Sequence, residues 1–141
     1  MDQRIGGNSG FLLEVACELA AHERAWERAA ALATEARATA KAGGSLALPC
    51  FADRVDGQAA VAAGDRRGGP ELLERAARSF EGIGARWERA RTELALSETL
   101  AASGNEDEAR KHISAALPAL EAAGAVEELE RARELAERLG S

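Results

Sequence analysis

Glycine recurs along this chain at a spacing that few folds can use. Gly44, Gly84 and Gly124 lie forty residues apart, and Gly64 and Gly104 lie midway between them. Each of these glycines follows a stretch of helix-forming residues, as a glycine that closes a helix does. The spacing therefore predicts helical hairpins repeated at one period, which is the arrangement of an α-solenoid.

The composition favours such a stack over a globule. The chain has 141 residues, and alanine makes up much of its 46% hydrophobic content. Small side chains let helices approach closely, but each buries little area, at roughly 25 cal/mol per Å² removed from water. The core is therefore expected to be extended and built from many small contacts.

The charge and the cysteines narrow the choice of partners and of compartment. A formal net charge of −6 does not favour nucleic acid or an anionic membrane surface, since both need dense Lys and Arg, so neither partner is expected. The two cysteines, Cys17 and Cys50, fit no pairing or metal-binding spacing and are interpreted as core residues. Because no apolar run of about 18 residues and no signal peptide is found, a cytoplasmic protein is expected.

Apolar residues at three- and four-residue spacing predict seven helices. Residues 1–10 are polar and glycine-rich and are expected to be a flexible lead-in, followed by a single helical repeat domain over residues 11–141. The first six helices form three hairpins, and the seventh, beyond Gly124, is interpreted as a terminal cap or the first half of a further repeat. The buried stripe of the first helix is expected to be Phe11, Leu12, Val15, Ala16 and Leu19.

Two prolines and one capping pair predict features of the fourth and sixth helices. Pro70 is placed where the first position of the fourth helix is expected, since proline lacks the amide that is unused there. Asn105 and Glu108 have the spacing of a capping box at the start of the sixth helix. Pro118 lies inside that helix and cannot donate to Ser114, which predicts a kink.

Residues of similar type recur at matching points of successive units. In the third unit the pattern is Leu96, Ser97, Leu100, Gly104, Asn105, Ala109, Ile113, Ala116 and Leu117. The second unit repeats part of it in Gly57, Gly64, Asp65, Leu73 and Ala76, and the first in Cys17, Ala29, Ala33 and Ala36. Arg24 replaces the turn glycine of the first unit.

This pattern resembles the tetratricopeptide repeat (TPR) over roughly residues 11 to 139. It departs from the family in its period of forty rather than thirty-four residues, and in Asp56, where the family prefers a large apolar residue. The resemblance implies an all-α, right-handed superhelix of three hairpins plus a C-terminal helix. The string from Phe80 to Arg91 looks like the TPR-like tails of large bacterial signalling proteins and transcriptional regulators, which implies a protein-interaction scaffold from such a regulator.

The same resemblance places the first helix of each hairpin on the concave side of the superhelix. Alignment to the family pattern predicts a partner-binding face made of Phe11, Glu14, Glu18, Phe51, Arg54, Gln58, Arg91 and Glu98. Charges of both signs on such a face suit a protein or peptide partner, and Phe51 is a candidate apolar anchor.

No residues have the spacing that catalysis or cofactor binding requires. The glycine-rich stretches near Gly6 and Gly68 lack the P-loop spacing and are interpreted as loops. His22 and His112 are isolated and are interpreted as surface or satisfied side chains rather than as metal ligands. The chain is therefore expected to be no enzyme, and to need neither a metal nor another cofactor.

Two alternatives to a peptide-binding scaffold stay open. One is a solenoid that senses a small-molecule effector, such as a sugar, in its groove and transmits occupancy through a change in curvature. Clustered aromatic residues would favour this sensor, but only 4% of the chain is aromatic. The other is self-association through the terminal helices, because the ends of a solenoid leave apolar edges.

Overall fold

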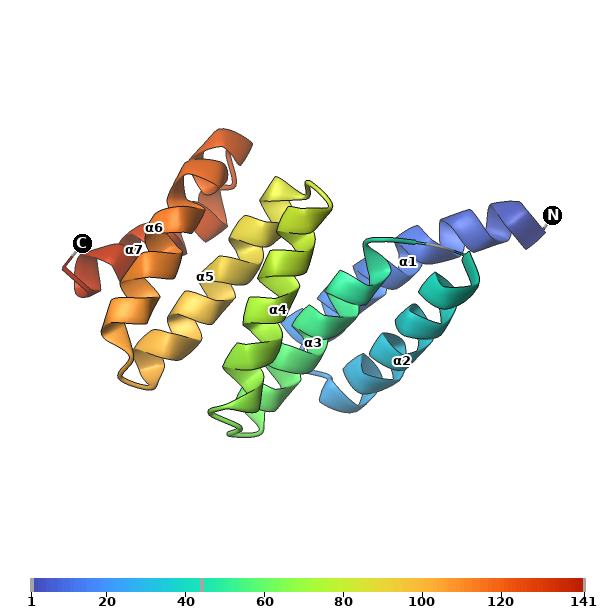
Figure 1. Cartoon of the computed structure of the whole chain (residues 1–141), viewed down its shortest axis with the longest axis horizontal. Helices are drawn as coiled ribbons and strands as arrows, with labels where there is room; N and C mark the ends of the chain where they lie inside the picture. Colours follow the sequence, from blue (N-terminus) through green and yellow to red (C-terminus); the bar gives the residue numbers. More distant parts are fainter. Residues whose placement is uncertain (1, 44, 141) are drawn as a thin grey trace. The chain divides into compact units, whose positions relative to one another are not determined.

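Seven α-helices make up the part of the chain that this computed structural model describes, residues 2–43 and 45–140 (Figure 1). Side chains are described for residues 10–43 and 45–140. These residues form no β-strand, so the predicted all-α class is confirmed. The chain divides into two compact units, Met1–Leu72 and Leu73–Ser141, with the boundary inside α4.

The first unit contains α1 (Asp2–His22), α2 (Trp26–Gly43), α3 (Leu48–Ala62) and the start of α4 (Gly68–Gly82). α2 packs against both α1 and α3, and α1 also contacts α3. The core is rich in alanine, which lets these helices lie close together. Its members are Leu13, Cys17, Ala20, Ala29, Ala33, Ala36, Ala40, Leu48, Ala52 and Val55.

The second unit contains the rest of α4, then α5 (Arg86–Ala102), α6 (Glu106–Ala123) and α7 (Val126–Arg138). α6 packs against α5 and α7, and α7 also contacts α5. Larger aliphatic side chains fill this core. Its members are Ala90, Leu94, Ala109, Ile113, Ala116, Leu120, Ala132, Leu135, Ala136 and Leu139.

The spaced glycines close helices, as the sequence predicted. Gly64, Gly84, Gly104 and Gly124 have φ angles of 87°, 76°, 87° and 67°. This left-handed conformation is free of strain only for glycine, which explains the residue type at each turn. Arg24, at the turn where the sequence departs from glycine, is held at φ 58°. Gly44 lies outside the described residues.

The buried stripe predicted for the first helix is wrong. The residues that pack into the unit are Leu13, Cys17 and Ala20. The exposed ones are Phe11, Leu12, Val15 and Leu19, at 65%, 62%, 47% and 50% of their surface, and Ala16 is half-buried. α1 has apolar residues on two faces, and the face with smaller side chains fits against the alanine-rich α2.

Helix starts differ from the sequence-based expectations in three places. α1 begins at Asp2 and so includes residues for which a flexible lead-in was predicted. α4 begins at Gly68, two residues before Pro70. The capping box is wrong, because the side chain of Asn105 makes no hydrogen bond to the first turn of α6. Within the described residues, no helix has the length and apolar character needed to cross a membrane.

Candidate functional site

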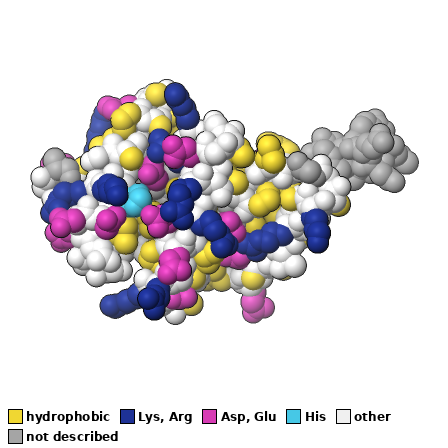
Figure 2. Space-filling view, viewed as in Figure 1, with side chains coloured by type: hydrophobic (Ala, Val, Ile, Leu, Met, Phe, Trp, Pro, Cys, Tyr) yellow, Lys and Arg dark blue, Asp and Glu magenta, His cyan; other side chains and the backbone are white. Residues whose placement is uncertain are grey.

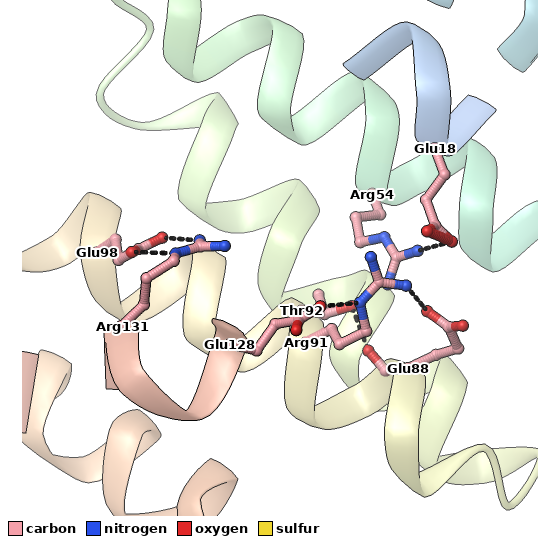
Figure 3. Close-up of polar contacts among 8 residues, drawn as sticks. All are labelled: Glu18, Arg54, Glu88, Arg91, Thr92, Glu98, Glu128 and Arg131. Carbon is pink, nitrogen blue, oxygen red and sulfur yellow. Dashed lines mark hydrogen bonds and ion pairs between the residues drawn. The ribbon is translucent and has the colours of Figure 1, made fainter. Parts of the chain in front are cut away.

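Three of the predicted binding residues meet in the first unit. Arg54 of α3 directs Nη2 toward Oε1 of Glu18 on α1, at 3.8 Å (Figure 3). Phe51 precedes Arg54 by almost one helical turn, and the Arg54 guanidinium lies 4.9 Å from the centre of its ring. Both side chains are 5% exposed. The ring and the carboxylate therefore hold the guanidinium in place, and Phe51 lies beneath it rather than open to a partner.

The other predicted residues of this unit lie one turn away. Glu14 precedes Glu18 by four residues on α1, and Gln58 follows Arg54 by four on α3, which places each pair on one helix face. Glu14 and Gln58 are both half-buried. Phe11 is the most exposed residue of the predicted set.

In the second unit, Glu98 of α5 is held by Arg131 of α7. Arg131 donates from Nη2 to Glu98 Oε1 at 2.7 Å and from Nε to Glu98 Oε2 at 3.2 Å (Figure 3). This two-point contact is the strongest geometry available to an arginine and a carboxylate. Hydrogen bonding to Glu98 raises the pKa of the Arg131 guanidinium above its usual value. The pair is nevertheless open to solvent, with side chains 46% and 37% exposed.

Arg91 lies between carboxylates of its own helix and of α7. Its Nη1 is 3.2 Å from Oε1 of Glu88, and its Nε is 3.4 Å from Oε2 of Glu128. The guanidinium also lies 5.3 Å from the ring centre of Trp87. Arg91 and Glu98 therefore each join α5 to α7.

Sequence reasoning placed Arg91 and Glu98 in the binding face but missed their partners on α7. The repeat itself carried the signal. Adding one forty-residue period to Glu88 and Arg91 gives Glu128 and Arg131. The pair of charges at the start of α5 is thus repeated at the start of α7, two helices further along the same unit.

Glu93 and His112 form a second polar cluster, between α5 and α6. Arg89 donates from Nη1 to Glu93 Oε1 at 2.7 Å. The other oxygen of Glu93 lies 3.5 Å from His112 Nδ1, and Glu108 Oε2 lies 3.9 Å from His112 Nε2. His112 is thus a satisfied side chain that braces two helices. Among the described residues, no three His, Cys, Asp or Glu side chains are grouped as metal ligands would be.

The second unit also has a groove of about 640 Å³ beside α6. Its apolar lining includes Trp87, Pro118 and alanines of α6, while Arg86 and Arg89 supply positive charge and Glu81 supplies negative charge. The size lies within the range of small-molecule sites, which is about 300–1,000 Å³. Sequence reasoning did not identify this groove, although Ala115, Ala119 and Ala122 have the spacing of a second apolar face on α6.

The face seen in Figure 2 carries both signs of charge. Figure 2 shows Lys and Arg side chains interleaved with Asp and Glu across the face in view. Comparison with protein-family models, with curated protein sequences and with solved structures finds no match to this chain. The function of the candidate site must therefore be argued from the residues of this chain alone.

Proposed function

We propose that this chain is a non-catalytic protein-binding module in which the odd-numbered helices of each unit form a binding face. The observation that carries the proposal is that charged pairs join successive odd-numbered helices in both units. Glu18 and Arg54 join α1 to α3, and Glu98 with Arg131 joins α5 to α7. Such pairs hold charged groups in fixed positions, which lowers the entropy lost when a partner binds.

Binding would proceed by exchange of ion pairs. An ion pair at an exposed site contributes only about 0.2–1 kcal/mol, so a carboxylate of a partner can take the place of Glu98 on Arg131 at small cost. The freed Glu98 is then available to a basic side chain of the same partner. A helical or extended segment with acidic and basic residues suits this face.

The finer parts of the proposal rest on the sequence pattern. In this proposal the helices are TPR-like repeats of a right-handed superhelix with the odd-numbered helices on its concave side. The TPR-like pattern supports assignment to a cytoplasmic regulator of bacterial signalling or transcription, in which this chain is the scaffold part.

A charge swap tests the face without removing the ion pair. In the double variant Glu98→Arg/Arg131→Glu, the two side chains can still pair while the charges offered to a partner are inverted. The matched control is Glu121→Arg/Arg133→Glu, because this exposed pair joins α6 to α7 at 3.3 Å and lies outside the proposed face. Proteins captured from a bacterial lysate by each form are identified by mass spectrometry.

The proposal expects one protein that is captured by the wild type and by the control swap but is lost from the Glu98/Arg131 swap. Circular dichroism must show the same helical signal in all three forms. If the Glu98/Arg131 swap captures the same proteins as the wild type, the odd-numbered helices of the second unit are not the binding face.

A second candidate function is the sensing of a small-molecule effector, and the groove beside α6 favours it. Trp87 lines this groove and offers an apolar ring for stacking, and Arg86 can receive an anionic or hydroxyl-rich group. In a Trp26→Phe background, Trp87 is the single tryptophan. Its fluorescence during titration with a low-molecular-weight bacterial extract should shift and saturate for a sensor, and stay constant for a scaffold that binds no effector.

A further inference from the structure

Two charges of opposite sign line the groove beside α6 without a partner. The charged residues of the lining are Glu81, Arg86 and Arg89. Arg89 is held by Glu93, with Nη1 2.7 Å from Glu93 Oε1. The side chains of Glu81 and Arg86 are exposed, and among the described residues neither has an ion pair or a hydrogen-bond partner. The groove therefore offers one unpaired charge of each sign to a ligand.

Both charges lie at helix ends that disfavour them. Glu81 is the second-last residue of α4, and Arg86 is the first residue of α5. The dipole of a helix is positive at its N-terminus and negative at its C-terminus, so it favours the opposite placement of acidic and basic side chains. Within the described part of the chain, no side chain compensates either charge. Charges that break a local rule without compensation are expected at functional sites.

The groove therefore has two regions of opposite electrostatic potential. At Arg86, the guanidinium and the positive end of α5 both attract an anion, and Ala85 at the N-cap gives that end no side-chain hydrogen bond. At Glu81, the carboxylate and the negative end of α4 both attract a cation. These two described side chains form no ion pair with each other, so one ligand that carries both charges can contact both.

An apolar surface completes the groove. Its lining includes Ala115, Ala119 and Ala122, which lie four and three residues apart along one face of α6. Trp87 adds an aromatic ring. The small side chains leave room, and burial of an apolar ligand group against this lining is favourable in proportion to the area removed from water. The groove thus suits a ligand with an apolar body and one charge of each sign.

We propose that this groove binds an apolar zwitterion, either a free α-amino acid with a large aliphatic or aromatic side chain or a short peptide of such residues. The carboxylate of the ligand lies at Arg86, and its ammonium group lies at Glu81. Its side chain lies against Trp87 and the alanines of α6. The inference rests on the second candidate function, the sensing of a small-molecule effector, and names the chemical class of that effector.

The fluorescence of Trp87 in the Trp26→Phe chain tests this ligand class. The probes are leucine, phenylalanine and leucyl-leucine. Each probe is compared with its N-acetylated form, which lacks the positive charge, and with its C-terminal amide, which lacks the negative charge. A zwitterionic probe should shift the emission and saturate, and each modified form should bind about tenfold more weakly because it loses one charge-assisted contact. Saturation by leucyl-leucine alone identifies a peptide as the ligand.

Two charge-removing variants connect each ligand group to its residue. Glu81→Gln should weaken binding of the zwitterion about tenfold and leave binding of the N-acetylated form unchanged, because that form has no ammonium group. Arg86→Gln should weaken binding of the zwitterion by a similar factor and leave binding of the amide unchanged. Arg78→Gln is the matched control, since Arg78 is exposed on α4 and does not line the groove. All three changed side chains are exposed, so circular dichroism should show an unchanged helical signal.

The inference is overturned if no probe shifts the emission of Trp87, or if a modified form binds as tightly as its zwitterion. It is also overturned if both variants bind as the Arg78→Gln control does. These results are distinct from failure of the sensor function, which the titration with bacterial extract decides. A shift with the extract but with none of the probes means that the groove binds a ligand of another class, whereas no shift with either rejects the sensor as well.

Discussion

Val61 of α3 lies directly against the backbone of Gly69 at the start of α4. A β-carbon at Gly69 would be 2.6 Å from Val61 Cγ2 and 3.1 Å from the Val61 backbone nitrogen. The turn between them is held by Asp65, whose Oδ1 accepts a hydrogen bond from the Gly68 N–H at 2.8 Å. Gly69 is therefore required by close packing of two helices rather than by its φ angle.

Replacement of Gly69 by alanine should destabilise the first unit. Overpacking of this kind typically costs about 1–3 kcal/mol, which exceeds the gain of roughly 0.5–1 kcal/mol expected when alanine replaces a helical glycine. Gly82→Ala is the matched control, since it lies in the same helix with no neighbour within 4 Å of its β-carbon position. Urea unfolding should show a loss of stability for Gly69→Ala and a small gain for Gly82→Ala. If the two substitutions change the free energy of unfolding equally, Val61 can move away from the added β-carbon without cost.

The strained turn at Arg24 offers a gain in stability. A non-glycine residue in the left-handed conformation costs roughly 1–2 kcal/mol, and Arg24 has φ 58°. The guanidinium also lies 5.7 Å from the ring centre of Trp26. The cost of the backbone strain must therefore be separated from the gain of this cation–π contact. Arg24→Gly and Arg24→Ala both lose that contact, but only glycine relieves the strain. Thermal unfolding should place the glycine variant above the alanine variant by about 1 kcal/mol, and equal stability would exclude strain at this turn.

The number and order of the helices could be predicted because helix ends in this chain have local causes. A helix can end at a glycine such as Gly64 or Gly104 because glycine adopts a positive φ angle without strain. This cause lies in the residue itself and needs no distant contact. The face that α1 buries is not determined locally. Both of its faces are apolar, and the choice depends on the small side chains that α2 presents, as Ala33 and Ala36 do.

The contacts of the candidate site could be predicted only in part, for a similar reason. Alignment to the repeat placed Arg91 and Glu98 correctly on α5, but the contacts that hold them come from another helix. Arg131 lies thirty-three residues beyond Glu98. The residues around Arg131 do not indicate which distant carboxylate it pairs with. The burial of Arg54 over Phe51 likewise arises from packing that periodicity does not describe.

Pro118 should weaken α6, and its replacement should stabilise the second unit. The helix runs from Glu106 to Ala123 with Pro118 inside it. Proline has no N–H to donate to the carbonyl of Ser114, and within a helix it costs about 3 kcal/mol relative to alanine. Because the helix has already adapted to the ring, Pro118→Ala should recover only part of this cost of about 3 kcal/mol. Urea unfolding measures the gain, and Ala119→Pro should lower stability strongly. A neutral Pro118→Ala would mean that the carbonyl of Ser114 is satisfied in another way.

The buried thiols should make the first unit sensitive to alkaline pH. Burial raises the pKa of both Cys17 and Cys50 above the ordinary thiol value of 9.0. A thiol of the unfolded chain therefore loses its proton first as the pH rises. The stability that the two neutral thiols contribute is fully present below pH 9.0 and is lost as the pH rises through their folded-state pKa values.

The chain has no tyrosine, so few other groups titrate in this window. Urea unfolding at about pH 7.5 and about pH 9.5 should show a drop for the wild type. The decrease in the free energy of unfolding between the two pH values should be markedly smaller for Cys17→Ala/Cys50→Ala. The lower overall stability of this variant does not matter, because each protein is compared with itself at the two pH values. An equal drop in both proteins would assign the alkaline sensitivity to the lysines or to the chain as a whole, and would exclude the buried thiols as its source.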